Sequence, residues 1–283
     1  MSASDPVFVG FVGKLLAAYP DYAVLRAYLQ DATGQRQLAY ECLVAELEHA
    51  AYAIAEPQVA AAKLHWWSEE LERMEHGAAS HPLTQGLSAD EHAVRHASDL
   101  PARLLEGAIA QIEPPSPGDL AGQLAIMERF YLPLAELDPA PFPRDPRVLA
   151  AVARARALAR LLRELSLPSG ASREGRLAVP LNLLARHQLV RDDLVDERRA
   201  APAVREQLAA LDEAGAAIRP ALADASLPLR LRVRLDARLI ARARRNASPL
   251  PLLRAARGRL SPLAFWIAWR EARRAPRTHA SPA

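Results

Sequence analysis

Residues 62–74 read AKLHWWSEELERM, and Gly77 and then His81-Pro82 follow this stretch. Within it, apolar side chains recur every three or four positions, which places them on one face of a helix. Glu69 and Arg73 have the i,i+4 spacing of an exposed ion pair. The stretch therefore predicts an amphipathic core helix with a tryptophan anchor. Its predicted apolar face consists of Leu64, Trp67, Leu71 and Met74.

The same helical periodicity runs through most of the chain. Ala, Leu, Glu and Arg, which favour helices, dominate the periodic segments, and proline and glycine fall between them. We therefore expect one all-α domain over residues 1–283, in which 1–35 form a helical N-terminal part and 275–283 a disordered tail. The predicted helices span residues 7–30, 36–54, 57–77, 99–112, 118–136, 146–166, 178–188, 202–224, 228–246 and 261–274.

The composition excludes several classes of protein. Cys42 is the single cysteine, so neither a disulfide framework nor a cysteine-based zinc site can form. No apolar run reaches the length of about 18 residues that a spanning helix needs. The N-terminal segment has no basic start and no small-residue cleavage site. These features predict a cytoplasmic protein, either free or peripheral to the inner membrane.

Charge is divided unequally between the two halves of the chain. Residues 1–145 carry 9 basic and 21 acidic side chains, whereas residues 146–283 carry 27 and 12, which gives net charges of −12 and +15. A basic half of this kind can bind an acidic protein partner or an anionic membrane surface. The arginines of residues 229–245 have no interleaved aromatic residues and no known motif, so we expect no nucleic-acid binding.

The stretch at 62–74 resembles a segment of the squalene/phytoene synthase family. A second resemblance to this family is formed by ALARLLRE (157–164), GRLAVP (175–180) and LLARH (183–187), and a third by residues 239–272. Together they cover most of the chain. The resemblance implies a single isoprenoid-synthase-like helical bundle around a central cavity. Active members of the family couple two prenyl diphosphates head to head in such a cavity.

Active family members hold Mg²⁺ with two aspartate-rich motifs on facing helices, and carboxylates at i and i+4 share a helical face. At the first motif position this chain has Glu46 and Glu48, with Ala51 where the partner carboxylate is expected. At the second motif position Glu164 replaces the leading aspartate, and residues 165–168 contain no acidic pair. The resemblance therefore implies that both magnesium motifs are lost. If the chain is active, these three glutamates are the candidate catalytic residues.

This pattern is closer to a non-catalytic branch of the family, which includes mitochondrial complex I assembly factors. Ionisation of an allylic diphosphate depends on several kcal/mol of stabilisation by metal ions. We therefore favour a non-catalytic protein that binds a prenyl diphosphate or other lipid-like ligand, or that acts in assembly, with no cofactor. One alternative is an active prenyltransferase that uses Mg²⁺. Another is a helical protein-interaction scaffold with no ligand.

Basic and aromatic side chains are the remaining candidates for the site. In active family members, basic residues near the second motif contact diphosphate oxygens, and the resemblance assigns this role to Arg163, Arg176 and Arg186. Their guanidinium groups suit phosphate oxygens, although pairing with acidic residues of the first half is an equal alternative. Three aromatic side chains are expected to line the cavity: Trp66, Trp67 and Tyr131.

Residues 191–196 read RDDLVD and contain the DDxxD spacing that prenyl synthases use. Asp192, Asp193 and Asp196 are therefore weak candidates for metal ligands. Within the resemblance, however, this position corresponds to a connecting segment and not to a metal-binding helix. Nearby arginines favour local ion pairs, and acidic residues are favourable in the first turn of a helix. We interpret the segment as the solvated start of a helix.

Overall fold

The computed structural model describes residues 6–88, 99–167 and 178–274. These residues form α-helices and two short 3-10 helices, with no strand among them, which confirms the expected all-α fold. Within the described ranges, no helix is both long enough and apolar enough to cross a membrane. The helices of the first half are α1 (Pro6–Ala18), α2 (Tyr22–Leu25), α3 (Ala32–Tyr52), α4 (Pro57–Glu75), α5 (Pro82–Ser88), α6 (Leu100–Ile109) and α7 (Leu120–Leu137). Those of the second half are α8 (Pro146–Leu165), α9 (Leu181–Arg186), η1 (Arg191–Val195), α10 (Glu197–Ile218), η2 (Arg219–Leu222), α11 (Leu227–Arg244), α12 (Pro249–Ala256) and α13 (Pro262–Arg274).

Helix ends follow the local chemistry of the sequence. Pro57, Pro146 and Pro249 occupy the first helical position, where the missing N–H group has no intrahelical partner to lose. Aspartates cap other helix starts by accepting hydrogen bonds from backbone N–H groups of the first turn. Asp31 accepts one from Gly34 at 2.7 Å at the start of α3. These signals explain why most helices lie within a few residues of their predicted positions.

The predicted helices differ from the structure in three places. The single helix expected over residues 7–30 is two helices, because Pro20 cannot donate the hydrogen bond that would join them. Helices α5 and α12 were not predicted. Both are short, so neither contains enough turns for a clear apolar period.

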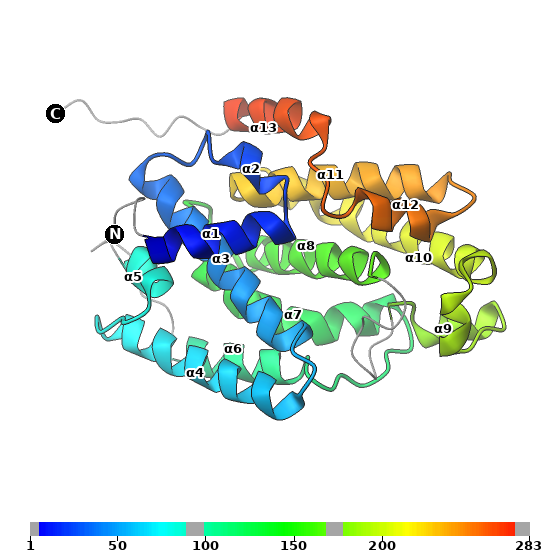
Figure 1. Ribbon diagram of the computed structural model, residues 1–283, viewed down its shortest axis with the longest axis horizontal. Coiled ribbons are helices and arrows are strands. Elements are labelled where there is room, and N and C mark those ends of the chain that lie inside the picture. Colours follow the sequence, from blue (N-terminus) through cyan, green and yellow to red (C-terminus); the bar gives the residue numbers. More distant parts are fainter. Residues whose placement is uncertain (1–5, 89–98, 168–177, 275–283) are drawn as a thin grey trace.

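Helix α8 lies in the middle of the molecule (Figure 1) and packs against α7, α10 and α11. On one side of α8, α7 packs against α6, and α6 packs against α4. On the other side, α11 packs against α13. One hydrophobic cluster runs through these layers and includes the fully buried Tyr40, Phe130 and Tyr131. This central position makes α8 the helix that connects the apolar core with the candidate site.

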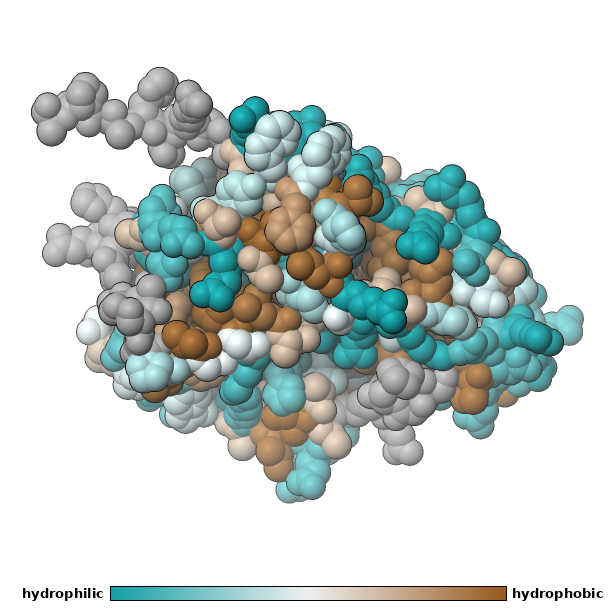
Figure 2. All heavy atoms as spheres, turned by 45° about the horizontal axis from the view of Figure 1, so that its top comes forward, coloured by the Kyte–Doolittle hydropathy of each residue, from teal (hydrophilic) through white to brown (hydrophobic). Residues whose placement is uncertain are grey.

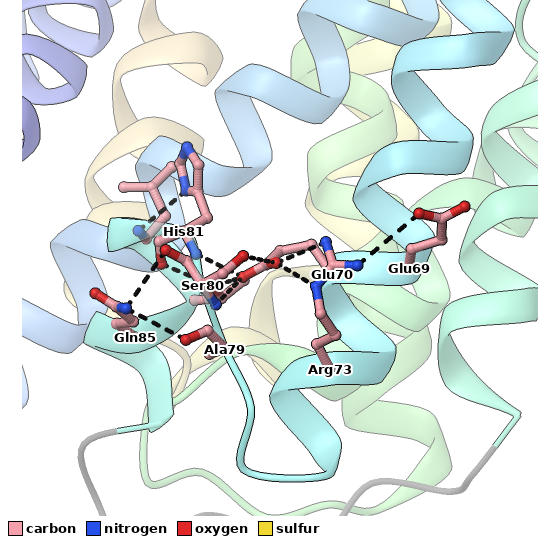
Figure 3. A network of polar contacts seen from close by, with 9 residues as sticks. Glu69, Glu70, Arg73, Ala79, Ser80, His81 and Gln85 are labelled. Atoms are coloured by element: carbon pink, nitrogen blue, oxygen red, sulfur yellow. Dashed lines mark hydrogen bonds and ion pairs between the residues drawn. The ribbon is translucent and has the colours of Figure 1, made fainter.

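A buried carboxylate joins the end of α4 to the start of α5 (Figure 3). The side chain of Glu70 is 0% exposed. Its Oε1 accepts hydrogen bonds from the backbone N–H groups of Ser80 at 2.8 Å and His81 at 2.7 Å, and from the Thr84 hydroxyl at 2.5 Å. Its Oε2 accepts from the Ser80 hydroxyl and from Nε of Arg73. These contacts fix the turn between the two helices.

Candidate functional site

A cavity of about 480 Å³ lies between α3, α8 and α11. The end of α1, the start of α2 and the segment 252–263 complete its wall. Residues 257–260 of this segment are exposed, so the cavity is open to solvent on that side. Its volume is within the range of about 300–1,000 Å³ that is usual for small-molecule sites.

The α8 side of the wall is basic. Arg156, Arg160 and Arg163 have the i, i+4 and i+7 spacing that places side chains on one helical face, and all three line the cavity. Nε of Arg160 donates to Oε1 of Glu164 at 2.8 Å. Nη1 of Arg163 donates to the Ala18 carbonyl oxygen at 3.0 Å, and no carboxylate among the described residues pairs with this guanidinium. Helix α8 therefore presents three guanidinium groups to the cavity.

The α3 side carries a carboxylate whose oxygens are already engaged. Glu48 lines the cavity and accepts hydrogen bonds from Oη of Tyr19 at 2.7 Å and from Oη of Tyr131 at 2.8 Å, one on each oxygen. Burial and the neighbouring Glu48 charge raise the pKa of Tyr19 and the pKa of Tyr131. Both hydroxyls therefore stay protonated at neutral pH and keep donating to this carboxylate.

Positive charge exceeds negative charge around the cavity. Its wall contains eight arginines and four carboxylates. Arg257 makes no ion pair with any described residue, and burial together with the nearby Arg163 and Arg160 guanidiniums lowers the pKa of Arg257. An anion between these side chains would relieve their repulsion. The arginines are Arg156, Arg160, Arg163, Arg232, Arg238, Arg242, Arg257 and Arg259, and the carboxylates are Asp21, Glu41, Glu48 and Asp236.

Comparison with known proteins shows the fold. No protein-family model matches the chain, and no curated protein matches its sequence. A crystal structure of squalene synthase HpnC from Alicyclobacillus acidocaldarius matches it with a TM-score of 0.53 and 17% sequence identity, over 95% of this chain and 96% of that chain. The chain has a squalene synthase-like fold. This confirms the expected isoprenoid-synthase-like bundle.

Within this squalene synthase-like fold, the candidate glutamates do not form a magnesium site. Glu46 pairs with Lys63 at 2.8 Å and with Lys14 at 3.3 Å, and it does not line the cavity. Glu164 is held by Arg160 and is likewise absent from the cavity wall. Among the residues that the structure describes, no three acidic, histidine or cysteine side chains lie close enough to hold a metal ion. The donor set present therefore does not fit Mg²⁺.

The DDxxD segment lies away from the cavity, at the start of α10. Asp193 forms an ion pair with Arg199 at 2.5 Å. Asp196 caps α10 by accepting hydrogen bonds from two backbone N–H groups of its first turn, at 3.0 and 3.1 Å. None of the three aspartates, including Asp192, lines the cavity. Their surroundings are those of a capped helix start.

Of the three arginines predicted to bind phosphate, the structure places Arg163 in the cavity wall. Arg186 is exposed on α9, pairs with Glu206 and does not line this cavity, so its role in binding phosphate stays a prediction. Arg176 lies outside the described residues. The sequence analysis missed Arg160 and Arg257, although the spacing of arginines along α8 was a readable signal for the former.

The aromatic residues need a correction as well. Trp67 and Tyr131 are buried in the core, at 2% and 0% exposure, and neither belongs to the cavity wall. Trp66 is 41% exposed on the surface of α4. Successive residues on a helix point about 100° apart, so when Trp67 faces the core Trp66 is turned outward. No residue of α4 belongs to the cavity wall.

Proposed function

We propose that this protein binds a prenyl diphosphate or another lipid-like anion without metal ions and without catalysing prenyl transfer. The observation that carries the proposal is the pair Arg163 and Arg257, which share a cavity and have no carboxylate partner among the described residues. The planar guanidinium group of arginine can donate two parallel hydrogen bonds to phosphate oxygens. Hydrogen bonds between charged partners are stronger than those between neutral groups.

The rest of the wall suits a hydrocarbon chain. Aliphatic side chains from α1, α3, α8, α11 and α12 line the cavity beside the arginines. Apolar surface that becomes buried against a ligand contributes roughly 25 cal/mol per Å². A ligand with a charged head and an apolar tail therefore matches both parts of the wall. The aliphatic residues are Leu15, Val44, Leu162, Leu229, Leu235, Leu239, Leu252 and Leu253.

Catalysis is disfavoured by the same chemistry. The leaving diphosphate of a prenyl transfer needs divalent cations to neutralise its growing charge. Both oxygens of Glu48 accept tyrosine hydroxyls, and Glu164 pairs with Arg160, so neither carboxylate is free to share a metal ion. Arginines can hold a diphosphate in its ground state. We therefore propose binding as the function of this cavity.

Calorimetric titration with farnesyl diphosphate is expected to show binding in the presence of EDTA and little change on adding Mg²⁺. The variant Arg163→Ala should weaken this binding about tenfold or more, because a hydrogen bond to a charged group contributes about 1.5–3 kcal/mol. Arg154→Ala is the matched control. Arg154 lies on the same helix, is 45% exposed, and pairs with Glu128 outside the cavity.

Parallel titrations with farnesol and with inorganic pyrophosphate would separate the contributions of tail and head. We expect each to bind more weakly than farnesyl diphosphate, because each contacts one part of the wall. Binding that requires Mg²⁺, or release of pyrophosphate above background, would favour an active prenyltransferase instead. No binding of any of the three compounds would favour an interaction scaffold.

A further inference from the structure

Helix α13 is already fully packed on its inner face. It lies against α11 and α2, and its buried residues are Ala264, Ile267, Ala268 and Glu271. The Glu271 side chain is 3% exposed and pairs with Nε of Arg234 at 3.0 Å. Arg230 donates to the Glu271 carbonyl oxygen at 3.1 Å. The inner face therefore accounts for the attachment of this helix to the molecule.

The outer face of α13 is nevertheless apolar and aromatic. A surface helix with one packed face normally carries polar residues on the opposite side. Here Phe265 is 56% exposed, Trp266 47% and Trp269 44%, and Leu263 at the start of the helix is 52% exposed. Figure 2 looks toward this side of the molecule, where hydrophobic areas lie among hydrophilic ones. Large apolar side chains exposed together on one helical face mark an interaction site.

Arginines accompany these tryptophans. The guanidiniums of Arg270 and Arg238 lie 4.5 and 5.7 Å from the centre of the Trp266 ring, and that of Arg273 lies 4.1 Å from the Trp269 ring. The only acidic residue of α13 is Glu271, which points inward. Tryptophan and arginine on one exposed helical face are typical of helices that lie in the interface of a membrane.

We propose that the outer face of α13 docks onto an anionic phospholipid bilayer. The charge of the face selects this partner over a second copy of the chain. Two such faces in contact would bring the arginines around Trp266 and Trp269 against one another, and like charges in an interface are costly. Anionic headgroups pair with these arginines, while the tryptophan rings enter the boundary between headgroups and acyl chains.

The position of α13 connects this surface with the cavity. Leu260 and Leu263, which precede and begin the helix, are exposed and also belong to the cavity wall. A protein docked through α13 therefore has the open side of its cavity next to the lipid. The docking depends on the helix surface alone, so it does not require that the cavity binds a ligand.

Flotation with lipid vesicles tests the proposal. The full chain is expected to bind phosphatidylcholine vesicles that contain phosphatidylglycerol, to bind pure phosphatidylcholine vesicles much less, and to lose binding at high salt. The double variant Trp266→Ala/Trp269→Ala should lower the partition coefficient about tenfold or more, because apolar area and charge together determine interfacial binding. Trp66→Ala is the matched control and should bind as the unchanged protein does. Trp66 is 41% exposed, and α4 and α13 lie on opposite sides of the molecule (Figure 1).

Circular dichroism would verify that the variants are folded. Arg273→Glu is a second change at an exposed residue, and we expect it to weaken binding to anionic vesicles to the same extent. The proposal is overturned if the unchanged protein does not float with anionic vesicles, or if the double variant and Arg273→Glu float as well as it does. Equal loss in Trp66→Ala would also overturn it. Finally, a dimer in sedimentation velocity that the double variant dissociates would assign the face to self-association.

Discussion

Replacement of Glu70 by alanine is expected to lower the free energy of unfolding by about 3 kcal/mol. The change removes the acceptor of the Ser80 and His81 backbone N–H groups. It also removes one acceptor of the buried Thr84 hydroxyl, which keeps the His81 carbonyl oxygen at 2.8 Å. A buried donor without a partner loses its hydration and gains nothing in return. Chemical denaturation of the purified chain measures the effect.

Glu69 provides a control at the neighbouring position. Its side chain is 66% exposed and lies 3.9 Å from Arg73. An exposed ion pair of this kind contributes about 0–1 kcal/mol, so Glu69→Ala should be nearly silent. If the two variants lost equal stability, the assignment of the buried network to Glu70 would be incorrect.

Acid should remove the contribution of Glu70 in a defined range. Burial alone would raise its pKa, but hydrogen bonds from Thr84, His81 and Ser80 outweigh this and lower the pKa of Glu70 to about 2. A carboxyl group in an unfolded chain titrates near 4.3. Stability from this group is therefore complete above about pH 4.3 and is lost as the pH falls toward 2. Glu70→Gln, which cannot titrate, should lack this part of the acid sensitivity.

The contrast between Glu69 and Glu70 shows which contacts can be predicted from sequence patterns. The apolar face formed by Leu64, Trp67 and Leu71 could be predicted because helical periodicity is a local property, and all three are buried. The same local rule selected Glu69, whose partner is four residues away. Most partners of Glu70 are ten to fourteen residues away, in a turn and a short helix that had no clear pattern.

The candidate site was predictable to a similar extent. Matching of motif positions selected Glu48 and Arg163 as candidates, and both line the cavity. It could not place Arg257, because only the tertiary structure brings residues 252–263 and α8 to the wall of one cavity. The misplaced Trp66 has a different cause. Helical geometry alone predicts that Trp66 points away from the face of Trp67. The expectation that both residues line the cavity followed the family resemblance instead.

The largest loss is expected for Arg156→Met, about 3–5 kcal/mol of unfolding free energy. The Arg156 side chain is 7% exposed, and its Nη2 lies 2.8 Å from Oε1 of Glu41 and 3.6 Å from Oδ2 of Asp138. Those two carboxylates are 2% and 0% exposed. Methionine keeps much of the volume of the side chain but leaves both charges buried without their cation, which is more costly than the loss of a surface pair.

Arg154→Met is the control, because Arg154 lies two residues away on α8, is 45% exposed, and pairs with Glu128. It should cost less than about 1 kcal/mol. Changing Glu41 to glutamine in the Arg156→Met background removes one of the stranded charges and should restore part of the loss. If the double variant were less stable than Arg156→Met, the cost would come from packing and not from unpaired charge.

Urea unfolding of Arg156→Met at two pH values separates charge from packing further. Burial raises the pKa of Asp138 to about 6 even though Arg156 opposes this effect, and Glu41 raises it as well. Without the arginine the pKa rises further, so the folded variant takes up protons that the unfolded chain releases. Its stability must then fall as the pH rises through this range. The difference in unfolding free energy between Arg156→Met and the unchanged protein is therefore expected to be larger at pH 8 than at pH 5. A loss caused by packing alone would be the same at both pH values.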